Sequence, residues 1–259
     1  MGAALVPAGL AAQAAAPWGP VDATRAVTFD LVRPSFDGLD LSFPSPMLYG
    51  GLRWPLTPTW GIVAEIPVAL FAGEGRSATL LGNPYVGVDY DTPAGRGLVG
   101  SLGARLPLAR EGGDFAGLAQ VIAAIGDFDR FEAWIEDQWA LAGHVGWRTR
   151  WQSGLSAGFT IGGTLWSPKN SDEELLADYR ADVGYREPRL AIGAEFTGRA
   201  ILTESGLNVG QRTVHQLSVG VGVALGPVWP RGFVRLPLDA DLKDSGFSTA
   251  FGLGATWVF

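Results

Sequence analysis

The sequence predicts an all-β protein, a transmembrane antiparallel up-and-down β-barrel of about 12 strands. Three observations predict this fold. Charged residues make up only 17% of the 259 residues, while there are 37 glycines and 10 tryptophans, as suits a wall with lipid outside and small side chains inside. Stretches of about ten residues alternate between bulky apolar and small or polar side chains. Short and long connections also alternate along the chain, as in outer-membrane barrels.

Composition limits the possible functions. The net charge of −7, without a basic patch, argues against a nucleic-acid partner. The absence of cysteine excludes a disulfide framework and a thiolate metal site. No cluster of histidines and carboxylates has the spacing of a metal site. The sequence therefore predicts no metal and no cofactor.

Residues 1–16 resemble the later part of a secretory signal. An apolar run is followed by Ala12-Gln13-Ala14 and Ala14-Ala15-Ala16, which both fit a small-x-small cleavage site. The basic n-region is missing, and a disordered Ala-rich tail is the alternative. Residues 17–259 are then expected to form a single barrel domain. Because no apolar run after residue 16 reaches the roughly 18 residues of a spanning helix, a membrane form requires a closed barrel.

Alternation predicts twelve strands. The clearest is 213–225, where His215, Leu217 and the following odd-numbered residues are predicted to face lipid, whereas Gln216 and Ser218 face inward. The predicted strands are 26–33, 46–56, 59–69, 83–91, 97–107, 138–148, 153–166, 175–186, 189–201, 212–225, 231–238 and 247–259.

The connections fix the orientation of the predicted barrel. One set is tight, near 55–58, 92–97, 148–153, 186–189 and 226–232, and the other is longer, at 34–45, 70–82, 108–137, 167–174, 202–211 and 239–246. Short turns lie on the periplasmic side of outer-membrane barrels. An even number of strands therefore places both termini in the periplasm.

Aromatic residues near strand ends predict a belt at the lipid–water boundary. Ordinary core packing is the alternative. The predicted belt consists of Trp54, Trp60, Trp147, Trp151, Trp166, Trp229, Trp257 and Phe259.

Two segments carry a resemblance to known proteins. The end of the chain, "STAFGLGATWVF", resembles the C-terminal signal of bacterial outer-membrane β-barrels, which the barrel-assembly machinery reads; Trp257 and Phe259 match it. Residues 80–97, "LLGNPYVGVDYDTPAGRG", are similar to the MetA-like (phenol-degradation-pathway) transporter-type barrel family. The resemblance implies an outer-membrane location and uptake of a small, often hydrophobic compound, and it implies no catalytic residues.

Alternation also assigns charged and titratable side chains to the lumen, because a charge facing lipid at mid-bilayer costs several kcal/mol. They would line a polar channel that orients a solute, or else pair with one another and fill the interior of a small barrel. The predicted lumen residues are Asp30, Arg53, Glu65, Asp89, Arg105, His144, Arg148, Asp178, Arg180, Asp182, Arg186, Glu195, Arg199 and Arg235.

Segment 108–137 does not alternate. Its apolar residues recur near helical spacing, with Asp114 as the predicted N-cap and a second short amphipathic turn after Gly126-Asp127. Because loops of this length are usually functional, we expect a gate in the lumen or over the mouth; packing on the outer rim is the alternative. The predicted gate residues are Phe115, Leu118, Ile122, Ile125, Phe131 and Trp134.

The predicted function is an outer-membrane channel or uptake barrel for a small, possibly hydrophobic, solute, surrounded by outer-membrane lipids. A non-conducting structural or adhesive barrel is the alternative. A lipid-modifying enzyme would need Ser or Asp within reach of His144 or His215; no motif supports one, and neither an enzyme nor a catalytic residue is predicted. The alternative fold is a soluble β-sandwich or lipocalin-like protein.

Overall fold

The computed structural model describes residues 25–37, 46–73, 76–92, 96–110, 114–168, 172–203, 212–240, 243 and 246–259. The signal-like segment 1–16 and most of the predicted link 202–211 lie outside them. The strands are β1 (Ala26–Phe36), β2 (Met47–Pro55), β3 (Trp60–Gly73), β4 (Arg76–Leu81), β5 (Tyr85–Asp91), β6 (Gly97–Arg105), β7 (Gln138–Arg150), β8 (Leu155–Pro168), β9 (Glu174–Arg186), β10 (Leu190–Ile201), β11 (Thr213–Val223), β12 (Val228–Pro237) and β13 (Phe247–Val258).

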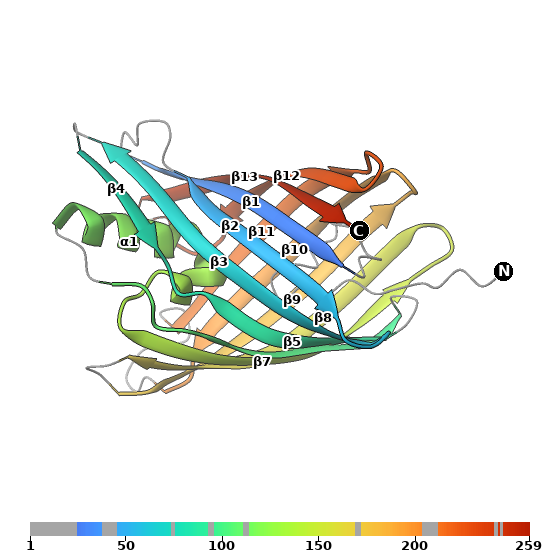
Figure 1. Cartoon of the computed structure of the whole chain (residues 1–259), viewed down its shortest axis with the longest axis horizontal. Helices are drawn as coiled ribbons and strands as arrows, with labels where there is room; N and C mark the ends of the chain where they lie inside the picture. Colours follow the sequence, from blue (N-terminus) through green and yellow to red (C-terminus); the bar gives the residue numbers. More distant parts are fainter. Residues whose placement is uncertain are drawn as a thin grey trace.

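The sheet closes into a barrel of twelve antiparallel strands, with β4 as an additional strand (Figure 1). Closure comes from β13, which pairs with β1 from Phe247 to Val258. Both β4 and β5 pair with β3. The last residues of β3, from Val68 to Gly73, pair with β4, and its first residues, from Trp60 to Glu65, pair with β5. β4 and β5 therefore occupy one strand position in the barrel wall, which is interrupted at residues 82–84. The predicted fold class is confirmed.

The structure differs from the prediction at 70–82, where we expected only a connection. β3 continues to Gly73 and forms a hairpin with β4. The six residues of β4 include Arg76, Ser77 and Thr79, and such a short, polar stretch gives little apolar alternation to read.

The strands alternate as predicted between an apolar outer face and a small or polar inner face. Leu253 is 66% exposed and Leu225 is 63% exposed, whereas the inward Gln216 and Ser218 are each 1% exposed. Apolar side chains cover the outer surface from one strand to the next, as a barrel in lipid requires. A dry sandwich interior would bury them instead.

Six of the eight aromatic residues predicted for the belt are exposed on the outside of the barrel, and two are not. The two are Trp166 and Trp229, which lie on the inner face. Trp166 packs edge-on against Phe131 with ring centroids 5.5 Å apart, and Arg186 lies over the Trp229 ring. Their strand parity, not their place near a strand end, decides their direction. The exposed members are Trp54, Trp60, Trp147, Trp151, Trp257 and Phe259.

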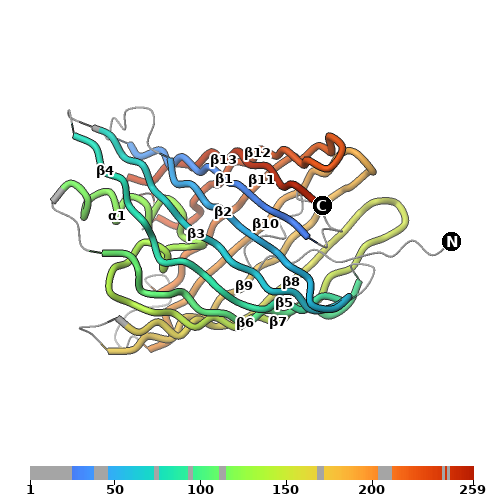
Figure 2. The backbone as a smooth tube through the Cα atoms, viewed as in Figure 1, coloured from blue at the N-terminus to red at the C-terminus, as the bar shows by residue number. Residues whose placement is uncertain are grey.

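The connection between β6 and β7 forms two helices, α1 (Asp114–Gly126) and the 3-10 helix η2 (Phe128–Ala133). Ala119, Ile122 and Ala123 of α1 pack with inward side chains of the neighbouring strands, such as Val32 and Phe71, in the main hydrophobic cluster. The backbone trace shows α1 at the end of the barrel opposite the end of β13 (Figure 2). Among the described residues, no helix has the length and apolar character to cross a membrane.

Candidate functional site: the lumen and its helical insertion

Segment 108–137, the helical insertion, is held at both ends by the side chain of Asn83. Asn83 is fully buried and lies in the break between β4 and β5. Its amide nitrogen donates to the carbonyl oxygens of Glu132 at 2.9 Å and Ile135 at 2.6 Å. Its amide oxygen accepts from the backbone N–H of Leu108 at 2.9 Å and Ala109 at 2.8 Å. One side chain therefore joins the start and the end of the insertion to the wall.

Buried ion pairs attach the middle of the insertion to the inner wall. The carboxylate of Asp127 pairs with Arg235 of β12. Arg130 lies 3.2 Å from Glu65 of β3, and Glu132 lies 2.7 Å from Arg199 of β10. Because these strands lie on different sides of the barrel, the insertion spans the lumen.

Two carboxyl groups of the insertion have shifted pKa values of opposite direction. Burial alone would raise the pKa of Asp127, but the adjacent Arg235 and Arg130 guanidinium groups lower it below its ordinary value. Burial raises the pKa of Glu132, and Arg199 offsets only part of that effect. Of these two carboxyl groups, Asp127 is therefore the one held more firmly in its charged form.

The predicted gate residues divide into an anchored set and an exposed residue. Ile122 and Trp134 are buried in the hydrophobic cluster, and the Trp134 indole donates to the Tyr49 hydroxyl at 3.1 Å. Phe115 and Ile125 are partly buried against the same cluster. Phe131 packs on Trp166, as described above. Leu118 is half exposed, as is Val121 one turn further along α1, so α1 presents a small apolar face away from the cluster.

The structure places the predicted lumen residues on the inner face, where most form ion pairs. The pairs are Arg53–Asp89 (2.8 Å), Arg105–Glu65 (2.9 Å), Arg148–Asp91 (3.4 Å), Arg180–Glu195 (3.5 Å), Arg199–Asp178 (2.5 Å), His144–Asp178 (3.4 Å), Arg231–Asp30 (2.6 Å) and Arg235–Asp127.

Several residues of this network were missed by the sequence analysis. Asp91 and Arg231 share strand parity with the predicted Asp89 and Arg235, so alternation could have found them. Asn83 begins the predicted strand 83–91 and shares parity with Asp89, but alternation does not record its bonds to the insertion. The carboxylates of the insertion lie outside the predicted strands and carry no such signal.

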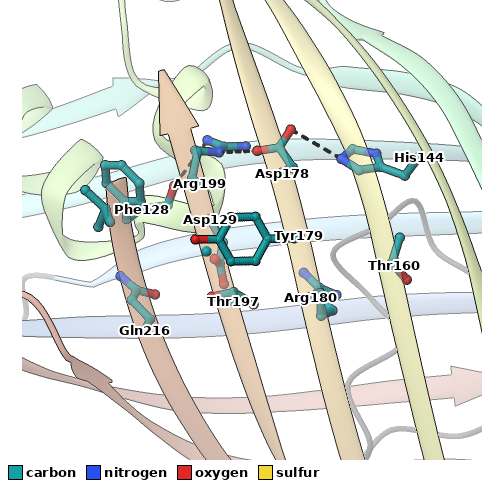
Figure 3. A pocket seen from close by; sticks show the side chains of 12 residues that line it. Phe128, Asp129, His144, Thr160, Asp178, Tyr179, Arg180, Thr197, Arg199 and Gln216 are labelled. Carbon is teal, nitrogen blue, oxygen red and sulfur yellow. Dashed lines mark hydrogen bonds and ion pairs between the residues drawn. The ribbon is translucent and has the colours of Figure 1, made fainter. Parts of the chain in front are cut away.

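A cavity of about 50 Å³ lies between η2 and the inner face of β7 to β11 (Figure 3). Figure 3 shows Arg199, Asp178 and His144 joined in a row along its edge. Its lining side chains on the wall are mainly charged or neutral polar, including Thr160, Thr197 and Gln216, and Phe128 of η2 contributes an aromatic ring. The cavity can therefore offer both hydrogen bonds and one apolar surface to a solute.

The two histidines lie on opposite faces of the wall. The ring of His144 lies over Gly162, where an added Cβ would come within 2.3 Å of it, and reaches Asp178. Ser101 Oγ is 3.5 Å from His144 Nδ1, at the limit of a hydrogen bond. A nucleophile and its base normally lie at about 2.6–3.2 Å, so this row is a weak candidate for acyl transfer.

His215 of β11 lies on the outer face, and its hydrogen bonds link β11 to β9 across β10 and to Asp239. Its Nε2 is 2.6 Å from the Tyr179 hydroxyl, and its Nδ1 is 2.9 Å from Asp239. The Tyr179 ring crosses Gly198, where a Cβ would come within 2.2 Å of the ring. Ser218 is buried on the inner face, as strand parity predicts, and does not meet His215.

Among the described residues, no group of three or more histidines and carboxylates could hold a metal ion.

Comparisons with known proteins identify the fold. No protein-family model and no curated protein matches the sequence. The COG4313 outer membrane channel from Pseudomonas putida F1 is similar in structure, with a TM-score of 0.62, 10% identity, and coverage of 93% of this chain and 98% of that one. LpxR from Salmonella typhimurium has a TM-score of 0.53, 14% identity, and coverage of 90% and 100%. The NanC porin has a TM-score of 0.53, 8% identity, and coverage of 91% and 100%. The chain therefore has the fold of bacterial outer-membrane β-barrels.

Proposed function

We propose that this chain is a bacterial outer-membrane channel for the passive passage of a small molecule, gated by the helical insertion. The observation that carries the proposal is the attachment of the insertion across the lumen, through Asn83 and through the pairs of Asp127, Arg130 and Glu132 with three different strands. A segment that crosses the lumen controls whatever passes through it. The structural similarity to a channel and a porin supports the same function.

The proposed solute is small and can be partly hydrophobic. The family resemblance of residues 80–97 supports this, as does the exposed apolar face of α1 at Leu118 and Val121. We propose that both termini are periplasmic, because the short turns lie on the side of the barrel where β13 ends.

Planar-bilayer conductance of the refolded protein, with and without residues 112–136, tests the channel and its gate. We expect small currents from the full chain and larger currents from the deleted form, because the deletion removes the segment that spans the lumen. If both forms pass neither ions nor solutes in liposome swelling, the channel proposal fails.

A non-conducting structural or adhesive barrel is the second candidate. The observation that favours it is the ion-pair network, which fills much of the inner face with partners that already satisfy one another. Silence of both forms in the conductance experiment would support it.

A lipid-modifying enzyme is the third candidate, and it rests on the row formed by Ser101, His144 and Asp178. Incubation of the refolded protein with outer-membrane lipid, with Ser101→Ala as the control variant, tests it. Release of fatty acid by the wild-type chain but not by the variant would favour this function over the channel.

The C-terminal signal is proposed to recruit the barrel-assembly machinery. Trp257 and Phe259 are exposed at the end of β13, with ring centroids 5.4 Å apart. Deletion of Phe259 should lower the amount of folded barrel in the outer membrane of an expressing cell, while the chain still refolds from urea in vitro. An unchanged amount of assembled barrel would exclude this role of Phe259.

A further inference from the structure

Neutral polar side chains form a row down the inner face of β10 and β11, beside the cavity. Gln216 is 1% exposed and lines the cavity, and Thr197 is its neighbour across the sheet. Among the described residues, neither amide atom of Gln216 has a hydrogen-bond partner, and the Ser218 hydroxyl two residues along also lacks one. Buried polar groups without a partner are costly and uncommon. Their position beside a cavity indicates that they serve a polar ligand.

The charged side chains of the same cavity are already committed to partners. Asp178 pairs with Arg199 and His144, and Arg199 also pairs with Glu132. Arg180 lies 3.5 Å from Glu195, and Asp129 lies 4.0 Å from Arg235. A charged solute would have to separate one of these pairs and lose its own hydration, and breaking a buried pair is strongly unfavourable.

We infer that this cavity binds a small uncharged molecule that carries a hydroxyl or carboxamide group. Gln216 offers two N–H donors and one carbonyl acceptor, which match such a group from both sides. The ring of Phe128 forms an apolar part of the cavity lining and contacts the non-polar part of the molecule. This inference rests on the proposed channel function and specifies its solute class.

The size of the cavity restricts the solute further. A water molecule requires roughly 10–15 Å³ of such space, so a cavity of about 50 Å³ admits a solute of only a few heavy atoms. Propionamide, propionate and n-propylammonium have this size and differ mainly in charge, so they form a matched set of test compounds.

Saturation-transfer NMR on the refolded full-length barrel in detergent tests the inference, with protein-free micelles as the baseline. We expect transfer to propionamide and several-fold less transfer to propionate and n-propylammonium. Gln216→Leu keeps a similar volume but removes both hydrogen-bonding groups, and should reduce transfer to propionamide several-fold. Thr28→Val is the control, since Thr28 is a buried hydroxyl near the other end of the barrel that bonds Thr256 at 3.1 Å.

The outcomes separate this inference from the channel proposal. Equal transfer to all three compounds, or unchanged binding by a folded Gln216→Leu barrel, would overturn the inference even if the protein conducts. Should Gln216→Leu fail to fold, Gln216→Glu replaces it, and a loss of propionamide binding is again required. Loss of conductance in both the full and the deleted chain would refute the channel but leave propionamide binding measurable.

Discussion

Asp127 is one of the residues through which the insertion is attached to the barrel wall. Its side chain is fully buried, and it pairs with Arg235 of β12 and, at 3.2 Å, with Arg130 of η2. Arg130 in turn lies over the ring of Tyr49, 4.0 Å from its centroid. Because a buried arginine is costly without a partner, one carboxylate holds two cations in place and the insertion with them.

Replacement of Asp127 should therefore loosen the insertion. Asp127→Asn leaves the Arg235 guanidinium without its main partner, and we expect a loss of about 3–5 kcal/mol in the free energy of unfolding, together with larger single-channel currents. Urea titration in lipid vesicles and planar-bilayer recording measure the two effects. Asp129→Asn is the matched control, because Asp129 lies 4.0 Å from Arg235; an equal effect of both variants would contradict the assigned role of Asp127.

The pH dependence of this contact follows from the lowered pKa of Asp127. The folded-state pKa lies below the unfolded value, which is about 3.9. The stabilisation by Asp127 is therefore complete above that value and is lost as the pH falls through the folded-state pKa. The difference in unfolding free energy between wild type and Asp127→Asn should stay constant from neutral pH down to about pH 4 and shrink below it. A difference that grows on acidification would have the wrong sign.

The insertion is the element that distinguishes this barrel from a plain ring of strands. α1 packs into the hydrophobic cluster of the inner wall, and η2 joins the polar network. Asn83 lies in the break between β4 and β5, and its side chain forms hydrogen bonds with both ends of the insertion. The same residue therefore marks the break between β4 and β5 and attaches the insertion to the wall.

Asn83→Leu should release the insertion while leaving the strands paired. It removes four hydrogen bonds, and each buried backbone group left without a partner costs about 1–3 kcal/mol. We expect faster proteolysis within 108–137 and larger currents. Gln120→Leu is the control, because it also removes a side chain-to-backbone bond of the insertion, to Arg110, but at an exposed site. Equal proteolysis of wild type and Asn83→Leu would refute the role of Asn83.

At the scale of the whole molecule, the barrel has an apolar outer face and a polar inner face. The outer face of β13 carries the exposed side chains of Phe251, Leu253 and Trp257. The inner face carries ion pairs that join strands two apart around the barrel, such as β2 with β5 and β12 with β1. An apolar outer face around enclosed charges is the arrangement expected of a barrel wall in a bilayer.

A charge on the outer face should cost free energy according to its depth in the bilayer. Leu253→Arg, in the middle of β13, should lower the free energy of folding into vesicles by about 2–4 kcal/mol. Leu225→Arg, at a turn and of similar exposure, should cost only about 0–1 kcal/mol. Urea titration in vesicles measures both, and equal costs would show that the outer face does not span a bilayer.

The sequence by itself determined the closed antiparallel barrel, its twelve strands and the direction of most strand side chains. This was possible because strand alternation has a fixed period of two and the lipid selects one face along every strand. Only the tertiary structure decided where the insertion lies, that Asn83 holds it, and which charges pair around it. These contacts join residues that are distant in the chain, such as Asp127 and Arg235, and no local periodicity records them. Trp166 differs from these contacts, because its parity with the inward Thr164 is present in the sequence, and parity rather than residue type decides which face an aromatic side chain takes.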